Sequence, residues 1–191
     1  MSNKMLKLLV VCGSLYRRNL LENICSSGSD ISLEEDIKLM SSIAERIDVI
    51  SLEKYNLPKI EFLAPNIYIH RVKYDEVELE IENIYTNLQN NSTDYLITQL
   101  LLCDIALQTA KKLRIKTIYY YRSFGSKLPI GIGEEFEPDK IVAVSQYAAK
   151  VARKLYKKNV YISYPKFIQP KDSRNVNVLF IKFSSNFCSI L

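Results

Sequence analysis

The chain has 191 residues, of which 48% are hydrophobic and 25% charged, and a formal net charge of +5. This balance is typical of one packed domain, with or without a short extension, and it excludes a disordered chain and two full domains. The apolar runs are shorter than the roughly 18 residues that span a bilayer, so we expect neither a transmembrane helix nor a signal peptide.

The first third of the chain predicts strand, helix and strand. Residues 7–13, KLLVVCG, form a continuous apolar run ended by glycine, as in a strand buried on both faces of a parallel sheet. The stretch that follows places four apolar residues on one face of a helix, with Ser32 as its N-cap: Leu33, Ile37, Met40 and Ala44. Residues 47–52 predict the second strand.

The middle of the chain continues this alternation. Residues 56–66 contain two prolines and predict a loop, and residues 67–74 predict a strand. A short strand is expected at 94–97, a helix at 100–114 and a strand rich in tyrosine from residue 116. A loop is expected at 125–140.

The last third contains a buried strand, a basic helix and another strand between residues 140 and 165. The helix begins near Ser145, and its apolar positions recur at helical spacing: Ala148, Val151, Ala152 and Leu155. Strands that alternate with helices imply right-handed crossovers. We therefore predict an α/β fold: a Rossmann-like, doubly wound, mostly parallel sheet with helices on both faces and ligands at the carboxyl ends of its strands.

The distribution of metal ligands argues against a metal site. Cys12, Cys25, Cys103 and Cys188 lack CxxC spacing, and His70 is the only histidine, so we expect reduced, mostly buried thiols and no metal. No cofactor is expected. His70 is interpreted as a strand histidine with its hydrogen bonds satisfied. No nucleic-acid-binding module is evident, so no nucleic acid is expected as a partner.

The end of the alternating region carries a family resemblance. DKIVAVSQYAAKVARKLYKKNVYISYP, residues 139–165, resembles the end of the N-terminal domain of GT-B fold glycosyltransferases of the family 4 type, with Asp139, Val144, Ser145 and Pro165 at the matching places. The similarity extends back through residues 93–125. The chain differs from the family in having a single glycine, Gly13, after its first strand and no histidines after the later strands.

The resemblance implies a division of the chain and a function. Residues 1–165 would form the acceptor-side domain, and residues 166–191 would form a linker and a terminal strand, VNVLFIKF, left from a missing donor domain. The chain would be the acceptor-side half of an enzyme that transfers sugar from a nucleotide sugar, its co-substrate, to the hydroxyl of an acceptor glycan, lipid or protein. A donor-domain subunit or a second copy of the chain would complete it.

Six residues near the predicted carboxyl edge of the sheet are candidates for substrate binding: Gly13, Ser14, Arg17, Gln99, Arg122 and Ser145. Backbone amides after Gly13 suit an anion, and Arg122 follows a strand, where a fixed cation meets a phosphate. Solvated arginines and a surface ion pair are the alternatives. Ser145 is also a candidate N-cap. No catalytic residue is assigned.

The basic helix gives two further alternatives. Its charged residues could rest on an anionic membrane or could form a solvated helix face: Lys150, Arg153, Lys154, Lys157 and Lys158. We expect a cytoplasmic protein, with peripheral membrane contact as one option. The alternative function is a non-enzymatic Rossmann-like binding or interaction module that uses this helix and the terminal strand as an interface.

Overall fold

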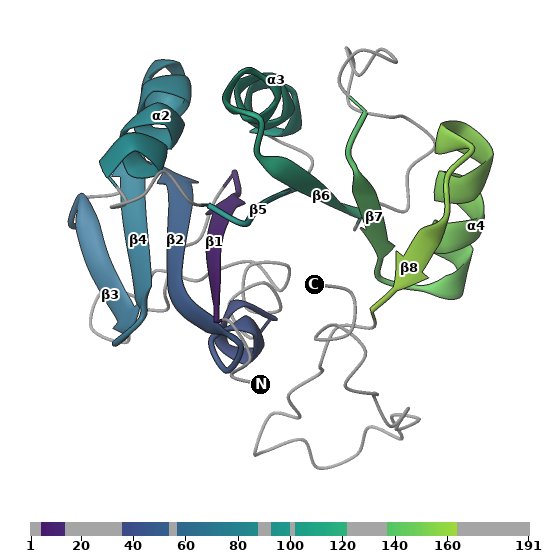
Figure 1. The fold of residues 1–191 in the computed structure, drawn as a ribbon, viewed down its shortest axis with the longest axis horizontal. Helices are drawn as coiled ribbons and strands as arrows, with labels where there is room; N and C mark the ends of the chain where they lie inside the picture. The colour runs from purple at the N-terminus through teal and green to yellow at the C-terminus, as the bar shows by residue number, and fades with distance from the viewer. Residues whose placement is uncertain are drawn as a thin grey trace, which may run out of the picture.

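A single sheet organises the part of the chain that the structure, a computed structural model, describes: residues 5–13, 36–53, 57–87, 93–99, 102–121 and 137–163. Its strands have the order β3-β4-β2-β1-β5-β6-β7-β8, and every neighbouring pair is parallel except β3 and β4 (Figure 1). The strands are β1 (Leu6–Val11), β2 (Ala44–Leu52), β3 (Ile60–Ala64), β4 (Ile67–Val72), β5 (Tyr95–Thr98), β6 (Lys116–Tyr121), β7 (Lys140–Ala143) and β8 (Val160–Ile162).

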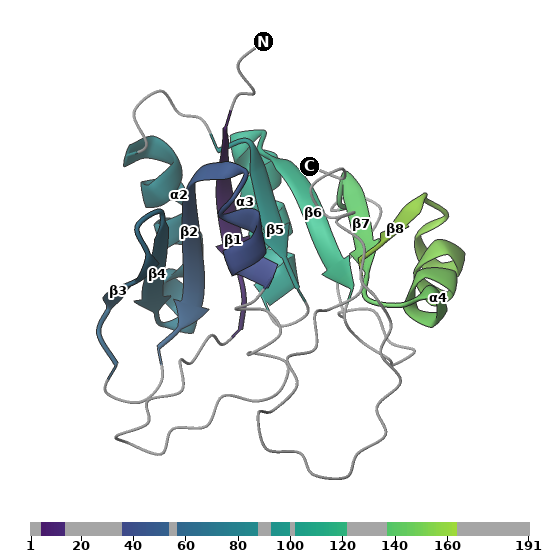
Figure 2. The same cartoon turned by 90° about the horizontal axis from the view of Figure 1, so that it is seen from below.

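Helices cover both faces of this sheet. The described helical elements are the short 3-10 helix η1 (Tyr74–Glu76), α2 (Val77–Asn87), α3 (Cys103–Leu113), α4 (Gln146–Tyr156) and residues 36–40. In Figure 2 the helix at 36–40 lies in front of the sheet and α2 and α3 lie behind it. The fold is therefore α/β and Rossmann-like, with helices on both faces, as the sequence predicts.

The alternation of side chains along each strand explains the two apolar layers. In β1, Leu9 and Val11 pack with α2 and α3, whereas Leu8 and Val10 pack on the opposite face with Ile37 and other buried residues. All four strand side chains are at most 2% exposed. Burial on both faces is the reason that β1 appears in the sequence as a continuous apolar run.

The helix predicted from residue 33 extends less far than expected. Residues 36–40 are helical and residues 41–43 form a turn, but Ala44 already belongs to β2. Ile37, Met40 and Ala44 are all buried, as predicted. The apolar spacing was compatible with one more turn of helix, but pairing of Ala44 with Leu6 of β1 starts the strand instead.

Two elements were not predicted from the sequence. The expected loop at 56–66 contains β3, an antiparallel edge strand that Arg71 of β4 fastens: its guanidinium donates to the Pro58 carbonyl oxygen at 2.9 Å and to Glu61 at 2.6 Å. Prolines flank β3 rather than interrupt it, which an edge strand tolerates. The second element is α2, whose buried residues Val77, Ile81 and Ile84 follow the spacing of a helix.

The basic helix α4 is confirmed, but its buried face is displaced from the predicted one. The buried side chains are Ala148, Ala149, Ala152 and Tyr156. Leu155, predicted to be part of the apolar face, is 38% exposed. The small alanines let α4 lie close to β7 and β8, and Tyr156 fills the space beside Tyr119 of β6, with ring centroids 6.1 Å apart. The predicted domain boundary at residue 165 lies outside the described residues.

Candidate functional site

The direction of chain progression reverses at the centre of the sheet, between β1 and β5. From β1 the chain proceeds to β2 on one side, and β5 pairs with β1 on the other, before β6, β7 and β8 continue outward. In open parallel sheets, ligands bind beyond the carboxyl ends of the strands at such a reversal. Val11 pairs with Thr98 at the ends of these strands. The residues that follow them therefore form the candidate site.

Gly13 and Gln99 are brought together at this edge. Gly13 is buried and lies two residues after the end of β1, and Gln99 is half-buried and directly follows β5. Cys12 holds the exit of β1 in place, because its amide nitrogen lies 3.0 Å and its thiol sulfur 3.5 Å from the carbonyl oxygen of Ile50. Because Gly13 has no side chain, a ligand can approach its backbone closely.

Thr98 adds a polar group that the sequence interpretation did not include. The side chain is 1% exposed, and its hydroxyl oxygen has no hydrogen-bond partner in the part of the chain that the structure describes. A buried hydroxyl without a hydrogen-bond partner is uncommon in folded proteins. Its place at the last position of β5, beside Gln99, is the signal that could have identified it.

The N-terminus of α3 follows the same edge. Its N-cap residue, Leu102, provides no side-chain hydrogen bond to the first turn, so the positive end of the helix dipole is not capped by a side chain. Asp104 in this turn has a buried carboxylate oxygen without a hydrogen-bond partner among the described residues, and burial raises the pKa of this carboxyl. Burial, together with the charge of Asp104, raises the pKa of the Cys103 thiol to about 12, so this cysteine is not a nucleophile near neutral pH.

Ser145 is an N-cap at the same edge of the sheet, two strands away from β5. Its hydroxyl oxygen accepts a hydrogen bond of 3.1 Å from the backbone nitrogen of Ala148, so the predicted capping role is confirmed. Two strand spacings amount to roughly 10 Å, so Ser145 does not adjoin Gly13 and Gln99 directly. Ser14, Arg17 and Arg122 lie outside the described residues.

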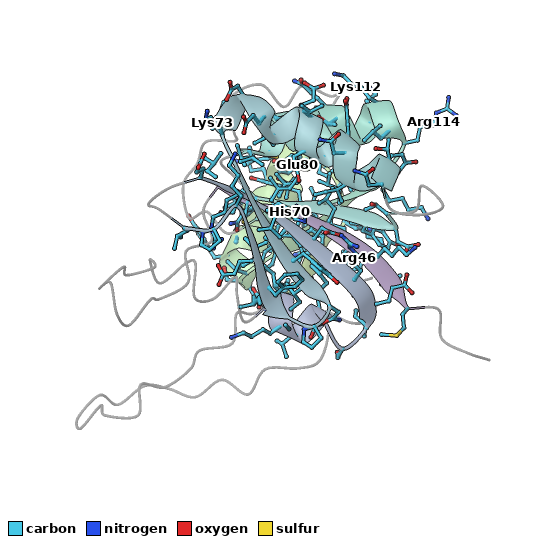
Figure 3. The ribbon with its side chains drawn as sticks, turned by 90° about the vertical axis from the view of Figure 1, so that its left-hand side faces the viewer. Arg46, His70, Lys73, Glu80, Lys112 and Arg114 are labelled. Carbon is cyan, nitrogen blue, oxygen red and sulfur yellow. The ribbon has the colours of Figure 1, made fainter. Side chains whose placement is uncertain are left out.

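A charged network beneath α2 is the main feature that the sequence interpretation missed, and Figure 3 labels three of its members, Arg46, His70 and Glu80. Asp48 of β2 accepts two hydrogen bonds from Arg46, at 2.7 and 2.8 Å, and its Oδ1 lies 2.9 Å from Nε2 of His70. The other ring nitrogen of His70, Nδ1, lies 2.9 Å from Glu80 of α2. The network therefore joins β2, β4 and α2 through four side chains.

The protonation of Asp48 is controlled by its neighbours. The side chain is only 1% exposed, and burial by itself would raise the pKa of the carboxyl. Hydrogen bonds from His70 and Arg46, with the attraction of both groups, outweigh burial and hold the pKa below its ordinary value. Arg46 is fixed from a second side by Tyr68, whose ring centroid lies 4.4 Å from the guanidinium carbon.

This network is structural in character. Both ring nitrogens of His70 face carboxylate oxygens, so the imidazole has no nitrogen left to act on a ligand. Asp48 lies opposite Leu9, which is in the middle of β1. The Asp48 side chain is therefore away from the carboxyl edge of the sheet. The expectation of a satisfied strand histidine is confirmed, and the network fastens α2 to the sheet.

The described residues offer neither a metal site nor a helix that spans a membrane. Among the described residues, no group of three or more His, Cys, Asp or Glu side chains could hold a metal ion. In the same part of the chain, no helix is long and apolar enough to cross a bilayer. Cys12 and Cys103 are buried free thiols, as predicted for these two, and Cys25 and Cys188 lie outside the described residues.

One solved structure supports the fold. No protein-family profile and no curated protein sequence matches the chain. A sucrose-phosphate synthase from Thermosynechococcus elongatus is similar in structure, with a TM-score of 0.54 and 9% identity over 83% of this chain and 48% of that one. The TM-score is 0.36 for a mutant tryptophan synthase α-subunit from Pyrococcus furiosus, which is 8% identical over 84% of this chain and 78% of that one. The TM-score is 0.34 for the epimerase Mth375 from Methanothermobacter thermautotrophicus, which is 13% identical over 84% of this chain and 51% of that one.

The chain thus spans about half the length of the sucrose-phosphate synthase that it resembles. At 9% identity this similarity applies to the fold. The described part of the chain is a Rossmann-like α/β domain.

Proposed function

We propose that the chain is the acceptor-side half of a GT-B glycosyltransferase. The observation that carries the proposal is the fold shared with the sucrose-phosphate synthase over 83% of this chain. The resemblance of residues 139–165 to the end of the N-terminal domain in GT-B enzymes supports the same assignment. The donor domain would be supplied by a partner subunit, by a second copy or by further polypeptide.

The chemistry would take place across a cleft between the two halves. A sugar would move from a nucleotide donor to an acceptor hydroxyl, with the nucleoside diphosphate leaving, and the half described here would bind and orient the acceptor. Gly13 has no side chain to keep a ligand from its backbone, and the half-buried Gln99 offers the donors and acceptors that a sugar or another hydroxyl-bearing ligand requires. The Thr98 hydroxyl, which has no hydrogen-bond partner among the described residues, lies buried beside it. The uncapped N-terminus of α3 would favour negative charge that develops on the leaving group.

One observation favours the alternative, a non-enzymatic binding or interaction module. The described residues that directly follow β1, β5 and β7 include no histidine, acid or lysine: Cys12, Gly13, Gln99, Val144 and Ser145. A general base for deprotonating an acceptor hydroxyl would then have to come from the donor half or from other residues. A module that only binds a ligand at this edge needs no such group.

The proposal is tested with the full chain and the proteins that co-purify with it from its native host. Release of nucleoside diphosphate is measured with UDP-, GDP- and ADP-sugars. Gly13→Val places a branched side chain after β1, where the ligand would approach the backbone, and Gln99→Ala removes the amide, so both variants should lower the rate at least about tenfold. Gln108→Ala, on an exposed position of α3, is the matched control and should not change the rate.

Either of two results would contradict the proposal. The first is the absence of any nucleotide release with every donor and every co-purified fraction. The second is sugar transfer that Gly13→Val and Gln99→Ala leave at the rate of the Gln108→Ala control. Circular dichroism of each variant shows whether a lost rate comes from lost folding, since Gly13 is buried.

A further inference from the structure

The outer face of α4 carries a ridge of lysines. Lys150 and Lys154 are exposed and lie four residues apart, which places them on one side of the helix. Lys157, also exposed, directly follows the helix as its C-cap. The helix itself, QYAAKVARKLY, contains no aspartate or glutamate. We call these three residues the basic ridge.

The basic ridge is not neutralised by the protein. None of its three side-chain ammonium groups forms an ion pair or a hydrogen bond in the part of the chain that the structure describes, although the backbone nitrogen of Lys157 donates to the carbonyl oxygen of Arg153. The other two basic residues of the region are engaged internally. Arg153 donates to the carbonyl oxygen of Val160 at 3.0 Å, and Lys158 lies 2.7 Å from Glu137. The five residues predicted as a membrane contact thus divide into three free cations and two structural ones.

An apolar stripe runs beside the basic ridge. Tyr147, Val151 and Leu155 recur every four residues, with Tyr147 64% and Leu155 38% exposed and Val151 half-buried. At about 100° per residue, Tyr147 is next to Lys154 around the helix axis. Exposed apolar groups beside lysines on a helix otherwise anchored in a domain are typical of a surface that meets a lipid interface.

We propose that the outer face of α4 binds an anionic membrane surface. The lysines would lie among the headgroups, and Tyr147 and Leu155 would enter the boundary between headgroups and acyl chains. The apolar stripe favours this partner over a nucleic acid, because a phosphate backbone would use the lysines and leave Tyr147 and Leu155 without an apolar environment. The inference does not depend on glycosyl transfer, because it rests on α4 alone.

The expected affinity follows from the three free charges. Each lysine near an anionic surface contributes roughly fivefold in binding, so the basic ridge contributes on the order of 100-fold. Such binding is reversible and decreases with salt, since the interaction extends over about one Debye length. It is the behaviour of a peripheral protein.

The test is co-sedimentation of the full chain with vesicles of phosphatidylcholine alone and of phosphatidylcholine with phosphatidylglycerol. We expect binding only to the anionic vesicles, and the triple variant Lys150→Glu, Lys154→Glu, Lys157→Glu should lose it by about 100-fold or more. The control variant Lys59→Glu, Lys73→Glu, Lys116→Glu has the same net charge and reverses three exposed lysines outside α4, so it should keep most of the binding. Tyr147→Ser with Leu155→Ser should weaken binding several-fold but leave its salt dependence.

Three outcomes would overturn the inference. Equal binding to neutral and anionic vesicles would exclude a role for the lysines. Equal loss in the two triple variants would mean that net charge, rather than the basic ridge, controls binding. Retention on DNA without vesicle binding would identify a different partner. The substituted side chains are exposed, but Leu155 is the less exposed of the two that the apolar variant changes. Thermal unfolding of every variant is therefore compared with that of the wild type.

Discussion

Replacement of Asp48 by asparagine tests the charged network beneath α2. The Asp48 side chain is 1% exposed, and its carboxylate accepts hydrogen bonds from the Arg46 guanidinium and the His70 ring at 2.7 to 2.9 Å. Asparagine keeps the shape but carries no charge and presents an amide N–H₂ group to one of these donors. The substitution therefore removes one partner of a buried ion pair without creating a cavity.

The expected cost is about 3 kcal/mol of the free energy of unfolding. Breaking a buried ion pair by removing one partner costs about 3–5 kcal/mol. We take the lower end, because the Arg46 side chain is 37% exposed and water can hydrate it again. At about 2–4 °C per kcal/mol for a domain of this size, the melting temperature should fall by about 6–12 °C.

The pH dependence distinguishes a charge effect from a packing effect. The pKa of Asp48 is lowered by folding, so its contribution to stability is complete above the ordinary value of 3.8 and is lost as the pH falls through the folded value. The stability difference between wild type and Asp48→Asn should thus be constant from pH 7 to about pH 5. Below pH 3.8 the stability difference between the two proteins should become smaller.

Urea denaturation of both proteins at several pH values measures this difference. Asp75→Asn, at an exposed position, is the matched control and should change the free energy of unfolding by less than about 1 kcal/mol. Two results would contradict a charge effect at Asp48. One is a loss of less than about 1 kcal/mol of unfolding free energy for Asp48→Asn at pH 7, and the other is a stability difference between wild type and variant that does not change at low pH.

Three further predictions concern single contacts. Ser145→Ala removes the N-cap of α4 and should cost about 1 kcal/mol of unfolding free energy in urea denaturation, whereas Ser145→Asp should retain the cap. Cys103, with a buried thiol of pKa about 12, should resist iodoacetamide at pH 8 in the folded protein and react after unfolding, as peptide mass spectrometry would show; rapid labelling of the native chain would contradict this. Asp139→Ala should cost about 1–3 kcal/mol, because the Asp139 carboxylate accepts from the backbone nitrogen of Thr117 at 2.7 Å and from its hydroxyl at 2.8 Å; an unchanged urea midpoint would exclude this role.

The fold was predictable where burial on both faces leaves an uninterrupted apolar run. β1, β6 and β7 are such runs, and the spacing of apolar residues indicated α3 and α4. The edge strand β3 gave no such signal, because an edge strand is partly exposed and is held by its pairing with β4 and by the contacts of Arg71 with Pro58 and Glu61. Tertiary contact, rather than local propensity, determines that strand.

The candidate site was predictable only in part. Gly13 and Gln99 could be placed because parallel strands end at a common edge, and any residue after a strand is carried there. The network of Arg46, Asp48 and His70 could not be assembled from sequence, since the pairing of β2 with β4 is needed to bring Asp48 and His70 within 2.9 Å. The spacing of Arg46 and Asp48, two residues apart on one strand face, was the only local signal.

Isothermal titration with UDP-, GDP- and ADP-sugars tests the proposed function most directly, because the proposal assigns this chain to the acceptor side of the cleft. The full chain is titrated alone and with the proteins that co-purify with it from its native host. We expect no donor binding by the chain alone, and binding with sugar transfer once a partner is present. Absence of binding in both settings would contradict the glycosyltransferase proposal and leave a Rossmann-like interaction module. Tight donor binding by the chain alone would contradict its assignment as the acceptor-side half.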